Sequence, residues 1–222
     1  MKEINLENIH WPDIGDATQD TLIMLGLSTL FTVMVGLPIG ILLFLSSRGQ
    51  LLQNRVSYTV LSLIVNVLRS VPFIILMILV IPLTKILVGT SIGVKGTIPP
   101  LVIAAAPFFA RLVETSLREV DRGVIEAAQS MGASRWQIVR KVLLPESRAG
   151  LIAAITITCV TLVSYTAMAG TIGGGGLGVL AIRYGYQRFQ PEVMVVTVVI
   201  LLILVQVLQT IGDRLVIRFS RK

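Results

Sequence analysis

The sequence has few of the residues from which disulfides, metal sites and catalytic centres are built. Of its 222 residues, one is a cysteine and one is a histidine. The single cysteine, Cys159, excludes a disulfide within the chain and a metal site built on cysteine thiolates. The histidine, His10, lies in the polar N-terminal segment, outside the apolar runs. An enzyme would need a nucleophile with a base, or a metal cluster. We therefore expect no catalytic and no metal-binding residues.

Charged residues are also scarce. They make up 14% of the chain, and hydrophobic residues make up 54%. Soluble domains carry about 25% charged residues, so this composition and the long apolar runs indicate an integral membrane protein. The length allows about five spans of roughly 20 residues. We predict an all-α, polytopic membrane protein with five transmembrane helices that form a single transmembrane domain over residues 1–222.

Five apolar runs predict the positions of these helices. The second run is too long for one straight crossing, and we expect a kink where Pro72 removes a backbone hydrogen bond. In the first run, Gly36 and Gly40 form a small-xxx-small step, which favours close packing against another helix. The predicted spans cover residues 21–45, 56–83, 98–117, 149–169 and 193–211.

Most basic residues lie in the segments 46–57, 118–148 and 213–222, and the net charge is +7. A basic chain can bind nucleic acid, but this one contains no nucleic-acid-binding module, and we expect no such partner. Membrane proteins keep Arg and Lys in their cytoplasmic loops. We therefore place the three basic segments in the cytoplasm. With five spans, the C-terminus is cytoplasmic and the N-terminus, with Glu3 and Glu7, lies outside.

A polar insert, Glu119 to Pro145, separates the third and fourth runs. Asp121 can cap the start of a helix by accepting hydrogen bonds from free backbone N–H groups. Gly132 can end that helix because glycine adopts the left-handed conformation without penalty. Ser134 can cap a second helix. We predict a cytoplasmic helix–turn–helix over about residues 119–147.

The turn of this hairpin is suited to contact with another protein. Small side chains allow a partner's backbone to approach closely, as in a helix that lies in a groove. Glu126 can pair with a basic residue, and Met131 can fill an irregular apolar pocket. The candidate docking residues are Glu126, Ala127, Ala128, Met131, Gly132 and Ala133.

The spacing of Glu126, Ala127, Ala128 and Gly132, followed by Leu144-Pro145, resembles the EAA loop of ABC importer permeases. In that family, the loop forms a coupling helix that sits in a groove of a cytoplasmic ATPase. The segments 66–73, 105–114 and 164–178 are similar to the methionine importers within the family. The similarity covers nearly the whole chain, and it is weakest over residues 1–20.

This resemblance implies the permease subunit of an ATP-driven importer, with the type I importer fold, which carries D- and L-methionine by alternating access. The implied partners are a second copy of the chain, two ATPase subunits, an external substrate-binding lipoprotein and the lipid of a bacterial inner membrane. ATP and Mg²⁺ are then bound by the ATPase, and this chain holds no cofactor. The alternatives are another amino acid or small polar solute as substrate, or an ion-coupled secondary transporter.

The glycine-rich segment 170–178 does not form a nucleotide phosphate loop. Such a loop needs Lys and Ser or Thr directly after its last glycine, and here Val179 follows Gly178. The chain therefore has no nucleotide site of its own. The segment is either a flexible outer turn, or an external gate or docking surface for a binding protein.

Four residues are candidates for a gate or a substrate path. Arg69 at mid-membrane costs about 2.5–3.5 kcal/mol on insertion scales, so it should face protein or a water-filled cavity. It lies either beside the path or in a structural pairing that holds the kink at Pro72. Tyr165 and Met168 fall at the outer end of the fourth run, where they either close the path or pack between helices.

Arg111 and Glu114 lie three residues apart near the cytoplasmic end of the third run. Residues at this spacing share one face of a helix. Long side chains near a membrane boundary extend their charged ends toward water. We therefore expect a surface ion pair, with a role in gating as the alternative.

Overall fold

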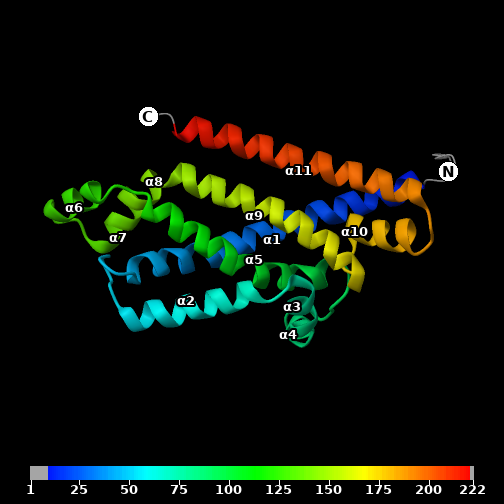
Figure 1. The fold of residues 1–222 in the computed structure, drawn as a ribbon, viewed down its shortest axis with the longest axis horizontal. Coiled ribbons are helices and arrows are strands. Elements are labelled where there is room, and N and C mark those ends of the chain that lie inside the picture. The colour runs from blue at the N-terminus through cyan, green and yellow to red at the C-terminus, as the bar shows by residue number, and fades with distance from the viewer. Residues whose placement is uncertain (1–9, 221–222) are drawn as a thin grey trace. The chain divides into compact units, whose positions relative to one another are not determined.

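Figure 1 shows the fold of the chain as a computed structural model, in which residues 10–220 are described. Every regular element in this range is a helix, which confirms the all-α prediction. Glu3 and Glu7 of the acidic tail, and Arg221 and Lys222 of the basic tail, lie outside the described residues. The α-helices are α1 (Trp11–Ser46), α2 (Arg55–Ser70), α3 (Phe73–Leu79), α4 (Ile81–Val88), α5 (Gly93–Arg118), α6 (Arg122–Ser130), α7 (Arg135–Ile138), α8 (Leu144–Glu146), α9 (Arg148–Ala169), α10 (Gly176–Leu180) and α11 (Pro191–Ser220).

Four of these helices, α1, α5, α9 and α11, are long and apolar enough to cross a membrane. A fifth span results if the broken pair α2 and α3 is counted as one. The helix α1 begins at Trp11, well before the predicted start near Thr21. Pro12 in its first turn and Asp13 near its positive end both favour a helix start. The first turns of α1 are therefore polar, and the apolar run follows them within the same helix.

The predicted kink at Pro72 is a complete break in the helix. The helix α2 ends at Ser70 and α3 begins at Phe73, and the pair is bent by 105°. Pro72 has φ −56° and ψ 135°, and its carbonyl accepts the amide of Leu76 at 3.0 Å to start α3. The proline ring also disfavours helical geometry at Val71. The second apolar run is therefore divided between separate helices.

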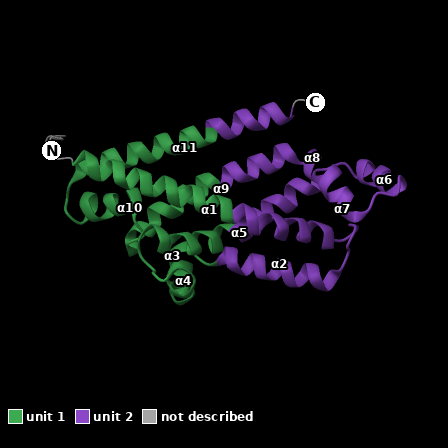
Figure 2. Cartoon of the chain, turned by 180° about the vertical axis from the view of Figure 1, so that it is seen from behind, with its two compact units in different colours: residues 1–31, 71–105, 159–209 green, residues 32–70, 106–158, 210–222 purple. Residues whose placement is uncertain are grey.

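The chain divides into two compact units (Figure 2). Unit 1 contains the chain up to residue 31, residues 71–105 and residues 159–209, and unit 2 contains residues 32–70, 106–158 and the chain from residue 210. Each of the four long helices contributes a stretch to both units. The single transmembrane domain over residues 1–222 stays a prediction.

Each unit has its own apolar core, and these cores explain why the long helices pack. In unit 1, side chains of α1, α3, α5 and α9 are buried together. In unit 2, side chains of α1, α5 and α9 are buried together with the polar insert. The unit 1 core includes Met24, Leu25, Phe73, Leu76, Met77, Leu101, Leu162 and Val163, and the unit 2 core includes Phe44, Leu45, Phe109, Val113, Leu117, Ile125, Ile138, Leu143 and Ala154.

Gly36 and Gly40 allow α1 to lie directly against α5 within unit 2. A Cβ atom on Gly40 would lie 2.6 Å from the carbonyl oxygen of Ala110 and 2.6 Å from the Cβ of Val113. A Cβ atom on Gly36 would lie 2.8 Å from the Cδ1 of Phe109. These distances are too short for carbon contacts, so only glycine fits. The predicted close packing is confirmed, and the partner helix is α5.

Replacement of Gly40 by leucine is expected to destabilise the protein by about 1–3 kcal/mol, the usual cost of overpacking a core. Thermal unfolding of the detergent-solubilised protein measures this change. Gly26→Leu is the matched control, because it lies on the same helix and a Cβ atom there meets nothing within 4 Å. Equal destabilisation by the two variants would contradict the close packing.

Candidate functional site

The polar insert folds as the predicted helix–turn–helix, and local hydrogen bonds determine where each helix begins. The Asp121 carboxylate accepts the amide of Gly123 at 2.7 Å and caps the start of α6. Ser134 caps α7 through two reciprocal bonds. Its hydroxyl accepts the amide of Gln137 at 3.3 Å, and its own amide donates to the Gln137 Oε1 at 2.8 Å. Both predicted caps are confirmed.

Gly132 ends α6 with the predicted left-handed backbone, at φ +76°. Its amide donates to the carbonyl of Gln129 at 2.9 Å, and the amide of Ala133 donates to the carbonyl of Ala128 at 3.1 Å. These bonds satisfy carbonyl groups that the helix end would otherwise leave free. A side chain at Gly132 would meet nothing within 4 Å, so the backbone geometry alone selects glycine here.

The hairpin is anchored on the core of unit 2. Ile125 of α6 and Ile138 of α7 are buried with Val113 and Leu117 of α5. A π-helical turn, Val139–Leu143, joins α7 to α8. Because these side chains form one continuous core, the hairpin and the end of α5 that leads into it are packed as one body.

The exposed side of the hairpin is what remains for a partner. Glu126, Ala127, Met131 and Gly132 are exposed, and Met131 is 81% exposed. We call these four residues the docking face. Trp136, which our sequence analysis did not select, is 69% exposed. Trp136 lies two residues before the buried Ile138, and residues two apart do not share a face of a helix, so this spacing is the signal that would have placed it on the outer side of α7.

Two of the predicted docking residues do not present their side chains to a partner. Ala128 is only 4% exposed and is part of the unit 2 core, and Ala133 is half-buried against the same core. The reason is the helical period, since Ala128 lies three residues after the buried Ile125 and shares its face. Their side chains stabilise the hairpin itself and are not presented to a partner.

A polar depression of about 230 Å³ lies beside α6. It separates α6 from the turn that follows α1, and Arg122 bridges the two by donating to the carbonyl of Gly49 at 3.2 Å. Glu126 of the docking face lines this depression. The depression is lined by Gly49, Gln50, Leu51, Arg122, Ile125, Glu126 and Gln129.

One of the gate candidates, Tyr165, makes a ring contact in unit 1. The ring of Tyr165 in α9 stacks on the ring of Phe73, which follows Pro72, with centroids 4.4 Å apart and planes 2° apart. Such a stack contributes about 0.5–1.5 kcal/mol. Met168 is 44% exposed on the same helix. Tyr165 therefore lies against the residue that directly follows Pro72.

Arg69, in unit 2, lies at the end of α2 and is exposed. Its guanidinium carbon is 5.8 Å from the centroid of the Phe108 ring, which is within the range of a cation–π interaction. This contact with α5 fits the structural pairing that we considered for Arg69.

The glycine segment of unit 1 is held by hydrogen bonds to two other helices. The hydroxyl of Thr97 in α5 donates to the carbonyl of Gly174 at 3.0 Å. The amide of Leu177 donates to the buried hydroxyl of Thr21 in α1 at 2.9 Å. Gly170, where the segment begins, is buried. The segment is thus a packed element with defined partners and not a free outer turn.

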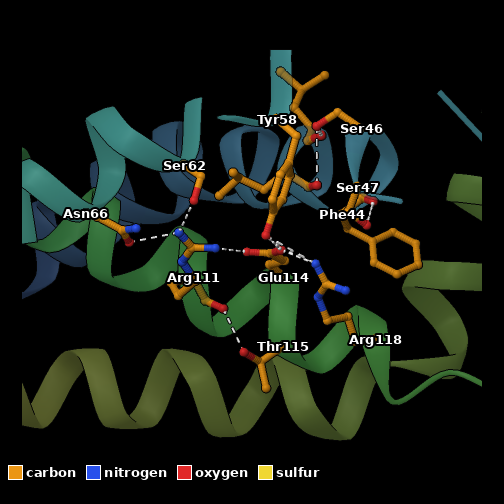
Figure 3. A network of polar contacts seen from close by, with 12 residues as sticks. Phe44, Ser46, Ser47, Tyr58, Ser62, Asn66, Arg111, Glu114, Thr115 and Arg118 are labelled. Atoms are coloured by element: carbon orange, nitrogen blue, oxygen red, sulfur yellow. Dashed lines mark hydrogen bonds and ion pairs between the residues drawn. The ribbon is translucent and has the colours of Figure 1, made fainter. Parts of the chain in front are cut away.

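The pair Arg111 and Glu114 differs from the expected surface ion pair. The Glu114 side chain is 2% exposed, and its two oxygens accept bonds from Arg111 at 2.5 Å and from Arg118 at 2.6 Å. The hydroxyl of Tyr58 in α2 also donates to Glu114, at 3.2 Å (Figure 3). The sequence pattern located the pair but not its burial, because the covering helix α2 is distant in sequence.

Among residues 10–220, no group of three His, Cys, Asp or Glu side chains lies close enough together to hold a metal ion. In the same part of the chain, the hairpin, the glycine segment and the break at Pro72 are the features that stand out from the apolar helices.

The comparison with known families decides the class. Residues 36–222 match the family of binding-protein-dependent transport system inner membrane components. The chain belongs to this family. Its members are membrane components of transport systems, so this chain is a permease subunit and not an enzyme.

Relatives from several bacteria share about half of its residues. The probable D-methionine transport system permease protein MetI of Vibrio cholerae is 51% identical over 206 residues, which cover 93% of this chain and 92% of the relative. The methionine import system permease protein MetP of Bacillus subtilis is 49% identical over 213 residues, which cover 96% of each chain.

Solved structures of the family confirm the permease fold. An inward-facing MetNI methionine ABC transporter contains a chain that is 46% identical and superposes with a TM-score of 0.94, over 98% of this chain and all of that chain. A crystal structure of an amino acid ABC transporter with histidines has a TM-score of 0.76 at 20% identity, and it shares the fold alone.

Proposed function

We propose that this chain forms the translocation path of an ATP-driven importer for D- and L-methionine. Two copies of the chain assemble with two cytoplasmic ATPase subunits and receive the substrate from an external binding protein. ATP and Mg²⁺ bind to the ATPase subunits, and this chain carries no cofactor. It lies in a bacterial inner membrane, with the N-terminus outside and with the C-terminus and the hairpin in the cytoplasm.

The docking face of the hairpin carries this proposal. Met131 is 81% exposed, and Ala127 and Gly132 beside it have almost no side-chain bulk. An exposed methionine next to small residues is costly in water but suits a helix that inserts into a groove of another protein. Glu126 adds a negative charge at the edge of the face, which a basic residue of the ATPase can pair with.

The names of the relatives support methionine as the substrate. Among residues 10–220, Glu114 is the one buried charged side chain, and it is already bonded to two arginines, so it offers no separate amino-acid site. We therefore assign substrate selection to the external binding protein, and passage of the delivered solute to the permease.

Alternating access follows from the rigid attachment of the hairpin. Closure of the ATPase subunits on ATP displaces the hairpin, and α5 moves with it because the two share one core. The ATPase can shift the permease between two conformations only if it binds them with different free energies. Hydrolysis of ATP then restores the first conformation.

Reconstitution tests the function. The chain is co-expressed with the ATPase and binding protein from the same bacterium, purified as a complex and placed in vesicles. We expect methionine to accumulate only with ATP and the binding protein, and we expect the purified chain alone to hydrolyse no ATP. Uptake that follows an ion gradient without the ATPase would establish a secondary transporter instead. ATP-driven uptake of a different solute would refute methionine as the substrate but not the ATP-driven importer.

A further inference from the structure

The helix α2 has little apolar attachment to the rest of unit 2. Along Arg55–Ser70, every residue of which the structure describes, Val65 is the single buried side chain. Much of its surface is exposed and apolar, with Val56 at 72% and Leu63 at 60% exposure. Val65 is buried with Leu43 of α1 and Ala110 of α5, and Tyr58 and Leu61 pack against this small cluster. Apolar burial is therefore confined to one part of α2, and polar contacts add to it.

These polar contacts align along two helices (Figure 3). Tyr58, Ser62 and Asn66 follow at intervals of four residues, so they form one stripe on α2. Arg111, Glu114 and Arg118 form the facing stripe on α5. We call these six residues the α2–α5 network.

Every bond across the network involves a charged group. Arg111 donates through Nη2 to the Ser62 hydroxyl at 2.7 Å and to the Asn66 amide oxygen at 2.8 Å. The Tyr58 hydroxyl donates to Glu114 at 3.2 Å. Hydrogen bonds to ionised groups are roughly twice as strong as neutral ones. The network therefore attaches α2 to α5 in addition to the apolar contact of Val65 with Ala110.

We propose that Glu114 and its two arginines are positioning residues for coupling, which make α2 follow α5 when the hairpin moves. This inference rests on the proposed function. The chain of contacts runs from the hairpin core to α5, from α5 through Arg111 and Glu114 to α2, and along α2 to its end at Ser70, next to the break at Pro72.

The buried carboxylate suits this role. Glu114 is the common acceptor of two guanidinium groups, and it keeps both at a spacing that matches the stripe on α2. Without its charge, the two arginines would lose the carboxylate that both of them bond to. An aspartate keeps the charge, whereas a glutamine keeps only the shape. Glu114→Asp and Glu114→Gln therefore separate charge from packing.

The decisive variant removes the polar groups that α2 contributes to the network and leaves those of α5 unchanged. Tyr58→Phe, Ser62→Ala and Asn66→Ala together delete the groups that bond to α5, and they leave both Glu114–arginine pairs inside α5 intact. We expect normal assembly and a normal rate of ATP hydrolysis in the reconstituted complex. Methionine transported per ATP should fall about tenfold, the effect of roughly one lost hydrogen bond to a charged group.

The matched control replaces exposed polar side chains of the same helix, Ser57→Ala with Thr59→Ala, and it should keep the wild-type ratio. Glu114→Gln should lower the ratio, and Glu114→Asp should largely restore it. A wild-type ratio in the triple variant, or a loss of assembly with an unchanged ratio in the remaining complex, overturns the inference. Absence of ATP-driven uptake in the wild-type complex refutes the proposed function instead.

Discussion

Replacement of Ala127 by tryptophan is expected to abolish ATP-driven transport while leaving the permease folded. Ala127 is exposed on the docking face, in the regular part of α6, so a large side chain there adds bulk without straining the backbone. A tryptophan would prevent close approach of the ATPase. We expect a loss of about 2 kcal/mol or more in binding, roughly 30-fold in affinity. Co-purification of the ATPase and methionine uptake in vesicles measure the effect.

A control for this variant is Leu202→Trp on α11, at a site that is 63% exposed and outside the hairpin. It should assemble and transport as the wild type does. Gly132 is a less suitable position for the same test, because its φ of +76° adds backbone strain to any side chain. Wild-type uptake in Ala127→Trp would show that the docking face does not contact the ATPase.

Replacement of Gly178 by valine is expected to destabilise unit 1 by about 3 kcal/mol, at the upper end of overpacking effects. A Cβ atom on Gly178 would lie 2.8 Å from the Cα of Ala167, so the clash is with backbone that cannot rotate away. Gly170 faces the same contact from the other side, since its Cβ atom would meet the backbone of Gly178. A shift of this size lowers the melting temperature by about 6–12 °C.

Gly173→Ala separates close packing from backbone conformation. Gly173 has φ +78°, but a Cβ atom there would meet only the Cγ2 of Ile92, at 4.0 Å. The left-handed backbone costs a residue with a Cβ atom about 1 kcal/mol, so Gly173→Ala should have roughly a third of the effect of Gly178→Val. Equal melting temperatures for the two variants would mean that the packing between Gly178 and Ala167 is not what stabilises the segment.

The helix boundaries of the hairpin were predictable because they depend on residues within four positions of each other. Asp121, Gly132 and Ser134 act through the backbone of their own turn, and each has the predicted role. The position of the break at Pro72 was predictable for the same reason, since proline acts on its own φ and on the preceding residue. The 105° angle between α2 and α3 was not predictable.

Whether a given side chain points toward the core or toward the surface was less predictable. Ala127 and Ala128 are neighbouring alanines with the same propensities, yet Ala127 is exposed and Ala128 is buried against the core of unit 2. Likewise, the pair Gly36 and Gly40 predicts a close helix partner without saying which helix it is. The rotation of α6 about its axis and the choice of α5 as partner depend on apolar surfaces brought together from separate parts of the chain.

The residues alone determined that this protein crosses a membrane, that it carries a folded polar hairpin and where that hairpin turns. Apolar length, capping and proline geometry are local properties, and each is determined within a few neighbouring residues. The tertiary structure alone decided the environment of Glu114, because its network joins pairs of residues that are 45, 49 and 56 positions apart in sequence. Burial of a charge depends on which helix covers it, and that contact forms only when distant segments pack together.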